Sequence, residues 1–259
     1  MQYTKELRTA KKAAREAGKY LMKKFRAPHQ NKISYKAKRE IVTEADIKAD
    51  KIIGKILKSK FSKYKIRSEE LESSMKKSEY LWLVDPLDGT NNFAHGLPIF
   101  AVCIALIHKD KLKVGVVYLP YFKEMFWAIK GEGAYLNGKK IKLSNVSKLE
   151  DAFILKCFRS DPQNRKKYLS IIKKLNKRVY SARHLGAAGY ELTAVARGHV
   201  AGGYILGMRA WDAAAGALIV RESGGKATNL KGKEWKLEDK DIVFSNGKIH
   251  KELISVINS

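Results

Sequence analysis

Apolar residues in the first quarter of the chain recur every three or four positions, which predicts two amphipathic helices. The first is predicted over residues 4–26, with an apolar face made by Leu7, Ala10, Ala14, Ala17, Leu21 and Phe25. The second is predicted from about residue 44 to 61, with Thr43 at its N-cap position. Between them, residues 27–40 are polar and basic and contain Pro28, which predicts a mobile loop.

From residue 64 onward, the pattern changes to that of strands. Residues 80–84 are continuously apolar, as expected for a strand buried on both faces. Residues 100–107, 112–119 and 124–129 are strand-like runs separated by short turn segments, as in an antiparallel meander. The pattern therefore predicts a sheet that follows the two helices.

After about residue 147, predicted strands and helices alternate. Strands are expected at 152–158, 178–183, 200–205 and 241–245, and helices at 162–176, 187–197, 211–223 and 248–257. This order is typical of α/β proteins, whereas the preceding part is typical of α+β proteins. We therefore predict an α+β half over residues 1–147 that carries the metal and phosphate motifs, and an α/β half over residues 148–259.

Composition adds a strong positive charge to this picture. The 259 residues include 52 lysines and arginines but 26 aspartates and glutamates, so the formal charge is +26. Such a charge attracts anionic ligands, from sugar phosphates to RNA. The lysines are spread along the whole chain, however, and no RNA-binding signature with interleaved aromatic residues is present. We expect nucleic-acid binding only as a secondary activity.

The hydrophobic residues, 45% of the chain, favour a folded globular protein over a disordered one. No apolar run approaches the roughly 18–20 residues that span a bilayer, and the first 20 residues lack the apolar core of a secretory signal. The two cysteines, Cys103 and Cys157, lie in apolar runs and are expected to be buried thiols. We therefore expect a cytoplasmic protein with no membrane association.

Two aspartates at the end of the predicted buried strand are the first candidates for chemistry. Asp85 and Asp88 are separated by Pro86, which fixes φ and can hold a bend, and by Leu87. Such a bend can direct both carboxylates and the Leu87 carbonyl toward one point. Ligands that are all oxygen favour a hard cation, above all Mg²⁺. The segment therefore predicts a magnesium site.

The residues after Asp88 favour phosphate chemistry. Gly89 and Thr90 precede a possible short helix, and backbone N–H groups at a helix start bind phosphate. Asp-Pro and Asp-Gly are also common turn dipeptides, so the segment taken alone fits a surface turn as well.

Three further acids lie far from this segment. Glu69 follows a short predicted strand, Asp46 lies in the first turn of a predicted helix, and Asp212 opens an apolar helix. Taken singly, Asp46 and Asp212 also fit helix-capping or helix-dipole roles. Together with Asp85 and Asp88, these positions favour a multi-carboxylate site.

These motifs carry a resemblance to a known family. The segment WLVDPLDGTNNF, with SEE and VTEAD upstream and AWDAAAGALIVRESGG downstream, resembles the inositol monophosphatase family. This is the Mg²⁺-dependent, lithium-sensitive phosphatase superfamily that includes archaeal-type fructose-1,6-bisphosphatases. Order and spacing match over roughly residues 5–257. The resemblance implies the layered α-β-α-β-α sandwich of the sugar phosphatases, with α+β and α/β character, and a homodimer.

The resemblance also implies which residues bind metal. The ligands would be Glu69, Asp85, the Leu87 carbonyl, Asp88 and Asp212. The first three would hold one Mg²⁺, and Asp85, Asp88 and Asp212 would hold a second. The loop at about residues 28–40 matches one that can carry a further ion, so two or three ions per subunit are implied.

The same resemblance assigns the reaction chemistry. Thr90 and Glu69, assisted by Asp46, would orient and deprotonate the attacking water. The backbone amides of Gly89 and Thr90, next to Asp88, would hold the phosphate. Two closely spaced cations can generate hydroxide and stabilise the leaving alkoxide.

The substrate is less sharply defined. Members specialised for inositol phosphate carry a glutamate seven residues before the aspartate that matches Asp212, where this chain has Ile205. Arg183 and Ala188 match substrate-contact positions, and Arg209 could reach a second phosphate. We therefore expect a small sugar or polyol phosphate, namely fructose 1,6-bisphosphate and/or inositol 1-phosphate. The alternatives are 3′-phosphoadenosine 5′-phosphate, histidinol phosphate, or an RNA- or transcription-associated binding role on the same fold.

Overall fold

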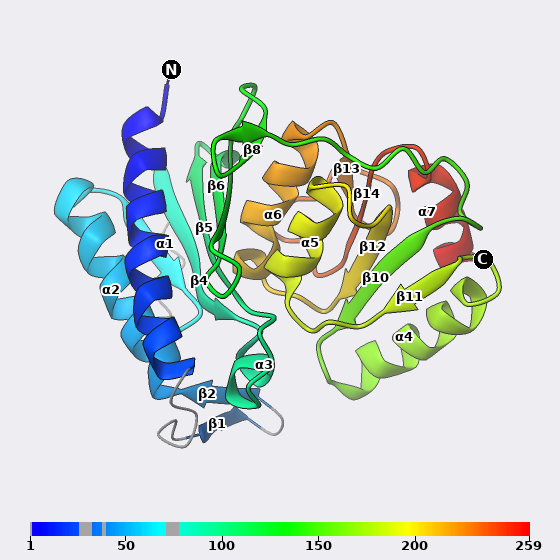
Figure 1. Ribbon diagram of the computed structural model, residues 1–259, viewed down its shortest axis with the longest axis horizontal. Helices are drawn as coiled ribbons and strands as arrows, with labels where there is room; N and C mark the ends of the chain where they lie inside the picture. Colours follow the sequence, from blue (N-terminus) through cyan, green and yellow to red (C-terminus); the bar gives the residue numbers. More distant parts are fainter. Residues whose placement is uncertain (1, 26–32, 38–39, 71–77) are drawn as a thin grey trace.

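The computed structural model describes residues 2–25, 33–37, 40–70 and 78–259. Helices and sheets alternate through the molecule in five layers (Figure 1). From the N-terminal side, these are a helix pair, a seven-stranded sheet, a second helix pair, a five-stranded sheet and a third helix pair. This arrangement confirms the predicted α-β-α-β-α sandwich.

The first layer consists of α1 (Thr4–Phe25) and α2 (Glu44–Lys60), which match the two predicted helices to within one residue. The face of α1 that packs on the sheet is built from small side chains, including the fully buried Ala10 and Ala14. At Gly18, an added Cβ would lie 2.5 Å from the ring of Tyr118. Small residues therefore let α1 approach the sheet closely.

The seven-stranded sheet contains the predicted buried strand and meander. In spatial order its strands are β3 (Lys65–Ser68), β4 (Tyr80–Asp88), β5 (Ala101–His108), β6 (Lys111–Leu119), β7 (Glu124–Ile129), β8 (Ala134–Leu136) and β9 (Lys139–Lys140). The β3–β4 pair is parallel and the other neighbours are antiparallel. Helices cover both faces of this sheet, which explains the continuous apolar run in β4.

The five-stranded sheet is mixed. In spatial order its strands are β11 (Ser181–Arg183), β10 (Phe153–Phe158), β12 (Gly202–Leu206), β14 (Ile242–Ser245) and β13 (Lys226–Thr228). Its helices are α5 (Ala188–Ala196) and α6 (Ala210–Glu222) between the sheets, and α4 (Pro162–Leu175) and α7 (His250–Asn258) on the outside. The boundary near residue 147 stays a prediction.

The central helix α6 shows why its sequence is apolar on every side. It contacts strands of both sheets, and Ala213 through Val220 are buried. On the β6 side, a Cβ added at Gly115 would lie 2.7 Å from the Ala215 carbonyl oxygen. A helix enclosed by two sheets has no solvent face, and thus no polar stripe.

The prediction of a loop over residues 27–40 is wrong in part. Residues Ile33–Ala37 form strand β1, which pairs antiparallel with β2 (Glu40–Thr43). The β-branched and aromatic residues of ISYKA and EIVT favour strands, and the surrounding lysines hide this preference in a reading based on polarity. The other residues of the predicted loop lie outside the described part of the chain.

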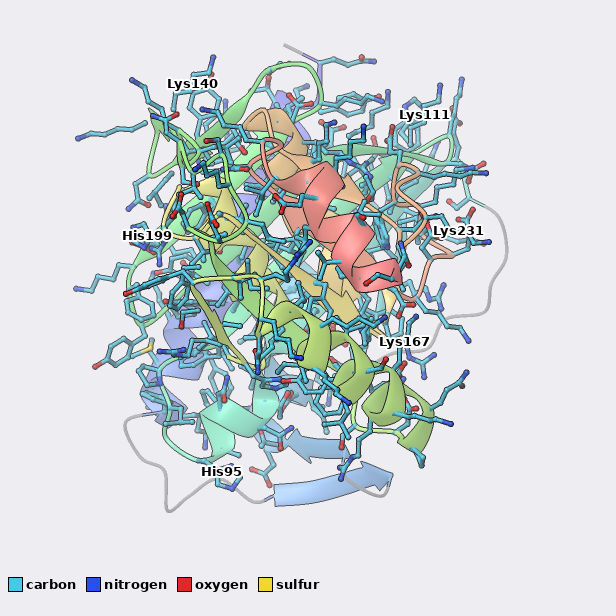
Figure 2. The ribbon with its side chains drawn as sticks, turned by 90° about the vertical axis from the view of Figure 1, so that its right-hand side faces the viewer. His95, Lys111, Lys140, Lys167, His199 and Lys231 are labelled. Carbon is cyan, nitrogen blue, oxygen red and sulfur yellow. The ribbon has the colours of Figure 1, made fainter. Side chains whose placement is uncertain are left out.

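Basic side chains surround the layered core. Lys111, Lys140, Lys167 and Lys231 lie well apart around one face of the molecule (Figure 2). Both cysteines are free thiols. Among the described helices, none has the length and apolarity to cross a membrane.

Candidate active site

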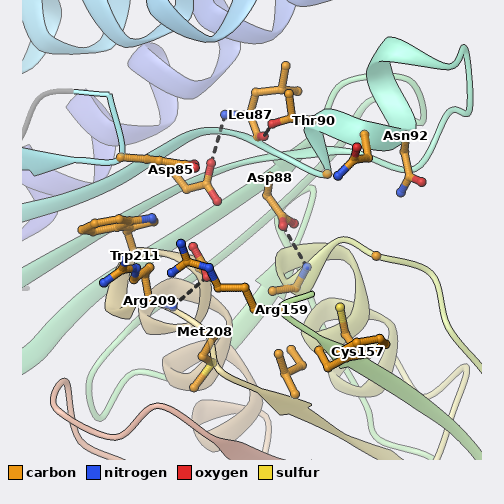
Figure 3. Close-up of a pocket in the computed structure, with 18 of the residues that line it drawn as sticks. Asp85, Leu87, Asp88, Thr90, Asn92, Cys157, Arg159, Met208, Arg209 and Trp211 are labelled. Carbon is orange, nitrogen blue, oxygen red and sulfur yellow. Dashed lines mark hydrogen bonds between the residues drawn. The ribbon is translucent and has the colours of Figure 1, made fainter. Parts of the chain in front are cut away.

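A cavity of about 890 Å³ lies beside the ends of strands from both sheets (Figure 3). Its walls come from the ends of β4, β10 and β12, the starts of α3 (Thr90–Ala94) and α6, and the loop before α5. The predicted site residues that line it are Glu69, Asp85, Leu87, Asp88, Gly89, Thr90, Ala188, Arg209 and Asp212. Residues from four distant segments thus meet in one place.

A bulge in β4 places the two aspartates on one side of the strand. Asp85 pairs with Cys103 of β5, but Asp88 pairs with Ala101, so β4 contains one extra residue between these two pairs. In a regular strand, residues three apart point to opposite faces. The bulge, which contains Pro86, removes that alternation. Both carboxylates therefore line the cavity, and the Leu87 N–H donates to Asp85 Oδ1 at 3.1 Å.

Glu69 joins Asp85 through the parallel pairing of β3 with β4. Ser68 is in register with Val84, and the Glu69 N–H continues the ladder by donating to the Val84 carbonyl at 3.2 Å. Glu69 therefore stands beside Asp85 at the end of the neighbouring strand. The Ser68 hydroxyl, which donates to the buried Asp50 carboxylate at 2.9 Å, fixes the end of β3 on α2.

Asp88 connects the two halves of the molecule. Its Oδ1 accepts from the Ala188 N–H at 2.8 Å, and its Oδ2 accepts from the Gly189 N–H at 2.7 Å. These amides belong to the first turn of α5, which has no side-chain cap of its own. An added Cβ at Gly189 would lie 2.5 Å from Cys103 Sγ, so glycine permits this approach. Asp88 is thus both a cavity carboxylate and the cap of α5.

Asp212 also has two roles. It is the third residue of α6, and its Oδ2 accepts from the Arg209 N–H at 2.8 Å. The helix-capping alternative is therefore correct for Asp212, but the residue lines the cavity as well.

The cavity carboxylates raise one another's pKa values. Burial is the main cause for Asp85, whose pKa lies well above its usual range, and the charges of Glu69, Asp88 and Asp212 add to it. Burial likewise raises the pKa of Asp88 to about 7 and that of Asp212 to about 7, although backbone N–H groups partly oppose both shifts. A bound cation would reverse this mutual repulsion.

The donor set fits a hard divalent cation. It consists of four carboxylates and the Leu87 carbonyl; Asp85 and Asp88 are buried, and Glu69 and Asp212 are partly exposed. In the described part of the chain, no three acidic, histidine or cysteine side chains are already arranged around a common point.

Asp46 reaches the site through Thr90. It caps α2, where its Oδ2 accepts from the Thr43 N–H at 2.8 Å and the Thr43 hydroxyl at 2.6 Å. Its Oδ1 lies 2.9 Å from the Thr90 hydroxyl, which is also 2.9 Å from the Leu87 carbonyl oxygen. Burial raises the pKa of Asp46 despite these hydrogen bonds. Asp46 therefore caps α2 and contacts the cavity residue Thr90, while its part in the reaction stays a prediction.

Gly89 makes the turn between Asp88 and Thr90. Its φ of +85° is one that side-chain-bearing residues rarely adopt. An added Cβ would also lie 2.8 Å from the Ile99 carbonyl oxygen. Both observations require glycine at this position.

Arg183, expected to contact substrate, does not line the cavity of this chain. Its guanidinium lies 5.4 Å from the centre of the Phe153 ring and donates to the Ser181 hydroxyl at 2.7 Å. Arg159, which was not predicted from the sequence, does line the cavity (Figure 3). Arg159 directly follows strand β10, and this position at a strand end is the feature of the sequence that could have identified it as a candidate site residue.

The comparisons with known proteins decide the family. The model of the inositol monophosphatase family matches residues 2–259. The chain belongs to this family. Members typically depend on Mg²⁺.

Several relatives of the chain are similar over nearly their full length. A "Putative Nus factor SuhB" of Neisseria meningitidis is 38% identical over 98% of both chains. A "Fructose-1,6-bisphosphatase/inositol-1-monophosphatase" of Aquifex aeolicus is 36% identical over 97% of this chain and 95% of that protein. The similar relatives in this family therefore carry two kinds of name, Nus factor SuhB and fructose-1,6-bisphosphatase/inositol-1-monophosphatase.

Solved structures of the family agree with the fold. The "extragenic suppressor protein suhB" of Bartonella henselae matches with a TM-score of 0.94 and 33% identity over 99% of both chains. The "IMPase" of Thermotoga maritima matches with a TM-score of 0.89 and 33% identity over 98% of this chain and 97% of that one.

Proposed function

We propose that this chain is a Mg²⁺-dependent phosphomonoesterase that hydrolyses small sugar or polyol phosphates. The convergence of Glu69, Asp85, Asp88 and Asp212 in one cavity, beside the Thr90–Asp46 pair, carries this proposal. Family membership supports a phosphatase, and the name of the Aquifex relative supports sugar and inositol phosphates.

In the proposed reaction, the carboxylates would hold the metal ions. Glu69, Asp85 and the Leu87 carbonyl would hold one ion, and Asp85, Asp88 and Asp212 a second. The ions would supply positive charge for the phosphate oxygens and lower the pKa of a bound water. A further ion in the region of residues 28–40 remains part of the proposal, and most of that region lies outside the described residues.

The chain's own residues would orient the water. The Thr90 hydroxyl donates a hydrogen bond to Asp46 or to the Leu87 carbonyl, which leaves its oxygen lone pairs free to accept a hydrogen bond from the attacking water. Asp46 keeps this orientation because Thr43 anchors its other oxygen. Glu69 lies on the opposite side of Asp85 and would act as the partner base. The Gly89 and Thr90 amides would bind the phosphate.

The part of the cavity wall beside Asp212 favours a substrate with a second anionic group. Arg159 and Arg209 both lie close enough to lower the pKa of Asp212. Ile205 and Met208 complete this wall with apolar surface. Guanidinium groups bind phosphate well, whereas Ile205 offers no hydrogen bond to an inositol ring. We therefore propose fructose 1,6-bisphosphate first and inositol 1-phosphate second.

A phosphate-release panel tests the activity. With Mg²⁺, we expect release from both fructose 1,6-bisphosphate and inositol 1-phosphate, and a loss of about 100-fold or more when a chelator is present. Exclusive release from 3′-phosphoadenosine 5′-phosphate or histidinol phosphate would replace the proposed substrate but keep the enzyme class. No release from any ester, or release that resists chelation, would contradict the proposal.

The arginine wall gives a second prediction. Arg159→Gln and Arg209→Gln should each lower kcat/KM for fructose 1,6-bisphosphate about 10- to 100-fold, because each removes charged hydrogen bonds to the second phosphate. The rate for inositol 1-phosphate should change much less. Arg183→Gln is the matched comparison, since it removes the same group outside the cavity. If Arg183→Gln selectively reduced bisphosphate turnover and the other two did not, the assignment of this wall would be wrong.

A transcription-associated or RNA-binding role is the second candidate. Two observations favour it, namely the relatives named Nus factor and the charge of +26. The separation of the lysines in Figure 2 does not suggest a single nucleic-acid path. Salt-sensitive RNA affinity in a chain without phosphatase activity would favour this candidate. A homodimer and a cytoplasmic location complete the proposal, and mass measurement in solution tests the former.

A further inference from the structure

The loop of residues 184–187 forms one wall of the cavity and is held by side chains. The N–H groups of Leu185 and Gly186 both donate to Glu191 Oε1, at 3.1 and 3.0 Å. On the other side, Asn92 Nδ2 donates to the Leu185 carbonyl at 2.7 Å. Gly186 has a φ of +73°, so the loop turns sharply between these two anchors. The backbone of Leu185 is thus held at both its N–H and its carbonyl.

This loop packs against the groups proposed to bind phosphate. A Cβ at Gly89 would lie 3.0 Å from the Ala187 Cβ, so the loop rests directly on the Gly89 turn. The next two amides, of Ala188 and Gly189, hold both oxygens of Asp88. A shift of the loop would therefore move the phosphate turn and a proposed metal ligand together.

The burial of the Glu191 carboxyl is unfavourable for the stability of the fold. Its side chain is fully buried on α5, and its Oε2 has no hydrogen-bond partner among the described residues. Burial raises the pKa of Glu191 to about 8. Burying a carboxyl with one oxygen unpaired is unfavourable. The two hydrogen bonds to the loop are the only ones that this carboxyl makes in the described part of the chain.

We propose that Glu191 is a positioning residue for the active site, which holds residues 184–187 against Gly89 and Asp88 so that the cavity can bind a phosphate group. This inference rests on the proposed phosphatase function. It assigns Glu191 no contact with the substrate. Its effect passes through the loop and should therefore appear in phosphate binding more than in the rate of the chemical step.

Glu191→Leu is the main test, because leucine can fill the buried site but accepts no hydrogen bond. We expect the dissociation constant for inorganic phosphate, measured by calorimetry with Mg²⁺ present, to rise about tenfold. KM for the ester that the parent hydrolyses should rise by a similar factor, with kcat changed by less than about threefold. The unfolding midpoint should change little, because removing the unpaired Oε2 offsets the loss of the acceptor for the Leu185 and Gly186 N–H groups.

Three further variants separate positioning from general stability. Glu191→Gln keeps an oxygen that can accept from the loop and should restore phosphate affinity to within about twofold of the parent. Glu191→Asp retracts that oxygen and should weaken phosphate binding even if Glu191→Leu does not fold. Thr193→Ala removes a fully buried hydroxyl on the same helix, which donates to the Gly189 carbonyl at 2.8 Å. It should lower the unfolding midpoint but leave phosphate affinity unchanged.

The outcomes distinguish this inference from the function on which it rests. If the parent with Mg²⁺ neither binds phosphate nor releases it from any ester, the proposed function fails and this inference fails with it. If the parent is active and Glu191→Leu or Glu191→Asp binds phosphate as the parent does, only this inference is overturned. A parallel loss of stability and affinity in Glu191→Leu, matched by Thr193→Ala, would also overturn it in favour of a structural role.

Discussion

Replacing Asp85 by asparagine should abolish turnover and, at the same time, make the metal-free protein more stable. Asp85 is buried among Glu69, Asp88 and Asp212, whose charges raise its pKa. Asparagine keeps an oxygen for the Leu87 N–H but removes a charge from this self-repelling group. The same change withdraws a carboxylate that both proposed ions share. We expect kcat/KM to fall by about 10³-fold or more.

The stability gain should be measurable by thermal unfolding in the presence of a chelator. A relief of about 1–2 kcal/mol would raise the midpoint by roughly 2–8 °C in a chain of this size. Glu124→Gln is the matched control, because Glu124 is a partly buried acid at the start of β7 that pairs with Arg197 outside the cavity. It should lose stability and keep activity. A fall in the midpoint of Asp85→Asn, or retention of turnover, would contradict the assignment.

Asp88→Asn is a less selective variant. Both oxygens of Asp88 accept from amides at the start of α5. An asparagine there would present its NH₂ group to one of these donors, so the variant would disturb helix packing as well as charge. Loss of turnover in Asp88→Asn would therefore mix two causes, which is why Asp85 gives the sharper test.

Local pattern was enough to predict most elements of the fold. The three- and four-residue spacing in α1 and the unbroken apolar run in β4 reflect burial that each segment undergoes as a unit. Strand β13 was missed because its three residues, Lys226–Thr228, are too few to show a period. The pairing of β1 with β2 was missed because lysines mask two short strand-forming segments.

The site was predictable where a side chain has a distinctive chemical role. Four of the five predicted acids line the cavity, and Asp46 contacts it through Thr90, but the geometry of Asp85 and Asp88 depends on a bulge that no periodicity reveals. Arg159 and Glu191 escaped notice for different reasons. The proposed role of Arg159 depends on its position beside Arg209 in the cavity wall, and only the fold brings these two residues together. The partners of Glu191 are backbone N–H groups of a loop, and every residue type except proline carries such a group, so the sequence does not reveal the pairing.

Mg²⁺ should stabilise the protein strongly at pH 8 and weakly at pH 5.5. In an unfolded chain, aspartates titrate near pH 4. Burial raises the pKa values of Asp88 and Asp212 in the metal-free fold to about 7. Between these values the folded chain holds more protons than the unfolded one, so these groups lower the stability of the metal-free fold as pH rises from about 4 to 7.

Metal binding should reverse that trend, because Mg²⁺ takes the place of the protons. The ionised carboxylates bind the cation, so apparent affinity for Mg²⁺ should increase as pH rises through about 7. At about 100 times the dissociation constant, the ion adds about 2.7 kcal/mol to the free energy of unfolding, roughly 5–11 °C in the midpoint. Thermal unfolding with Mg²⁺ or with NaCl of equal ionic strength, at both pH values, measures the effect. Asp85→Asn should lose most of it. An equal shift at pH 5.5 and 8, or an undiminished shift in Asp85→Asn, would place the bound ion somewhere other than among these carboxylates.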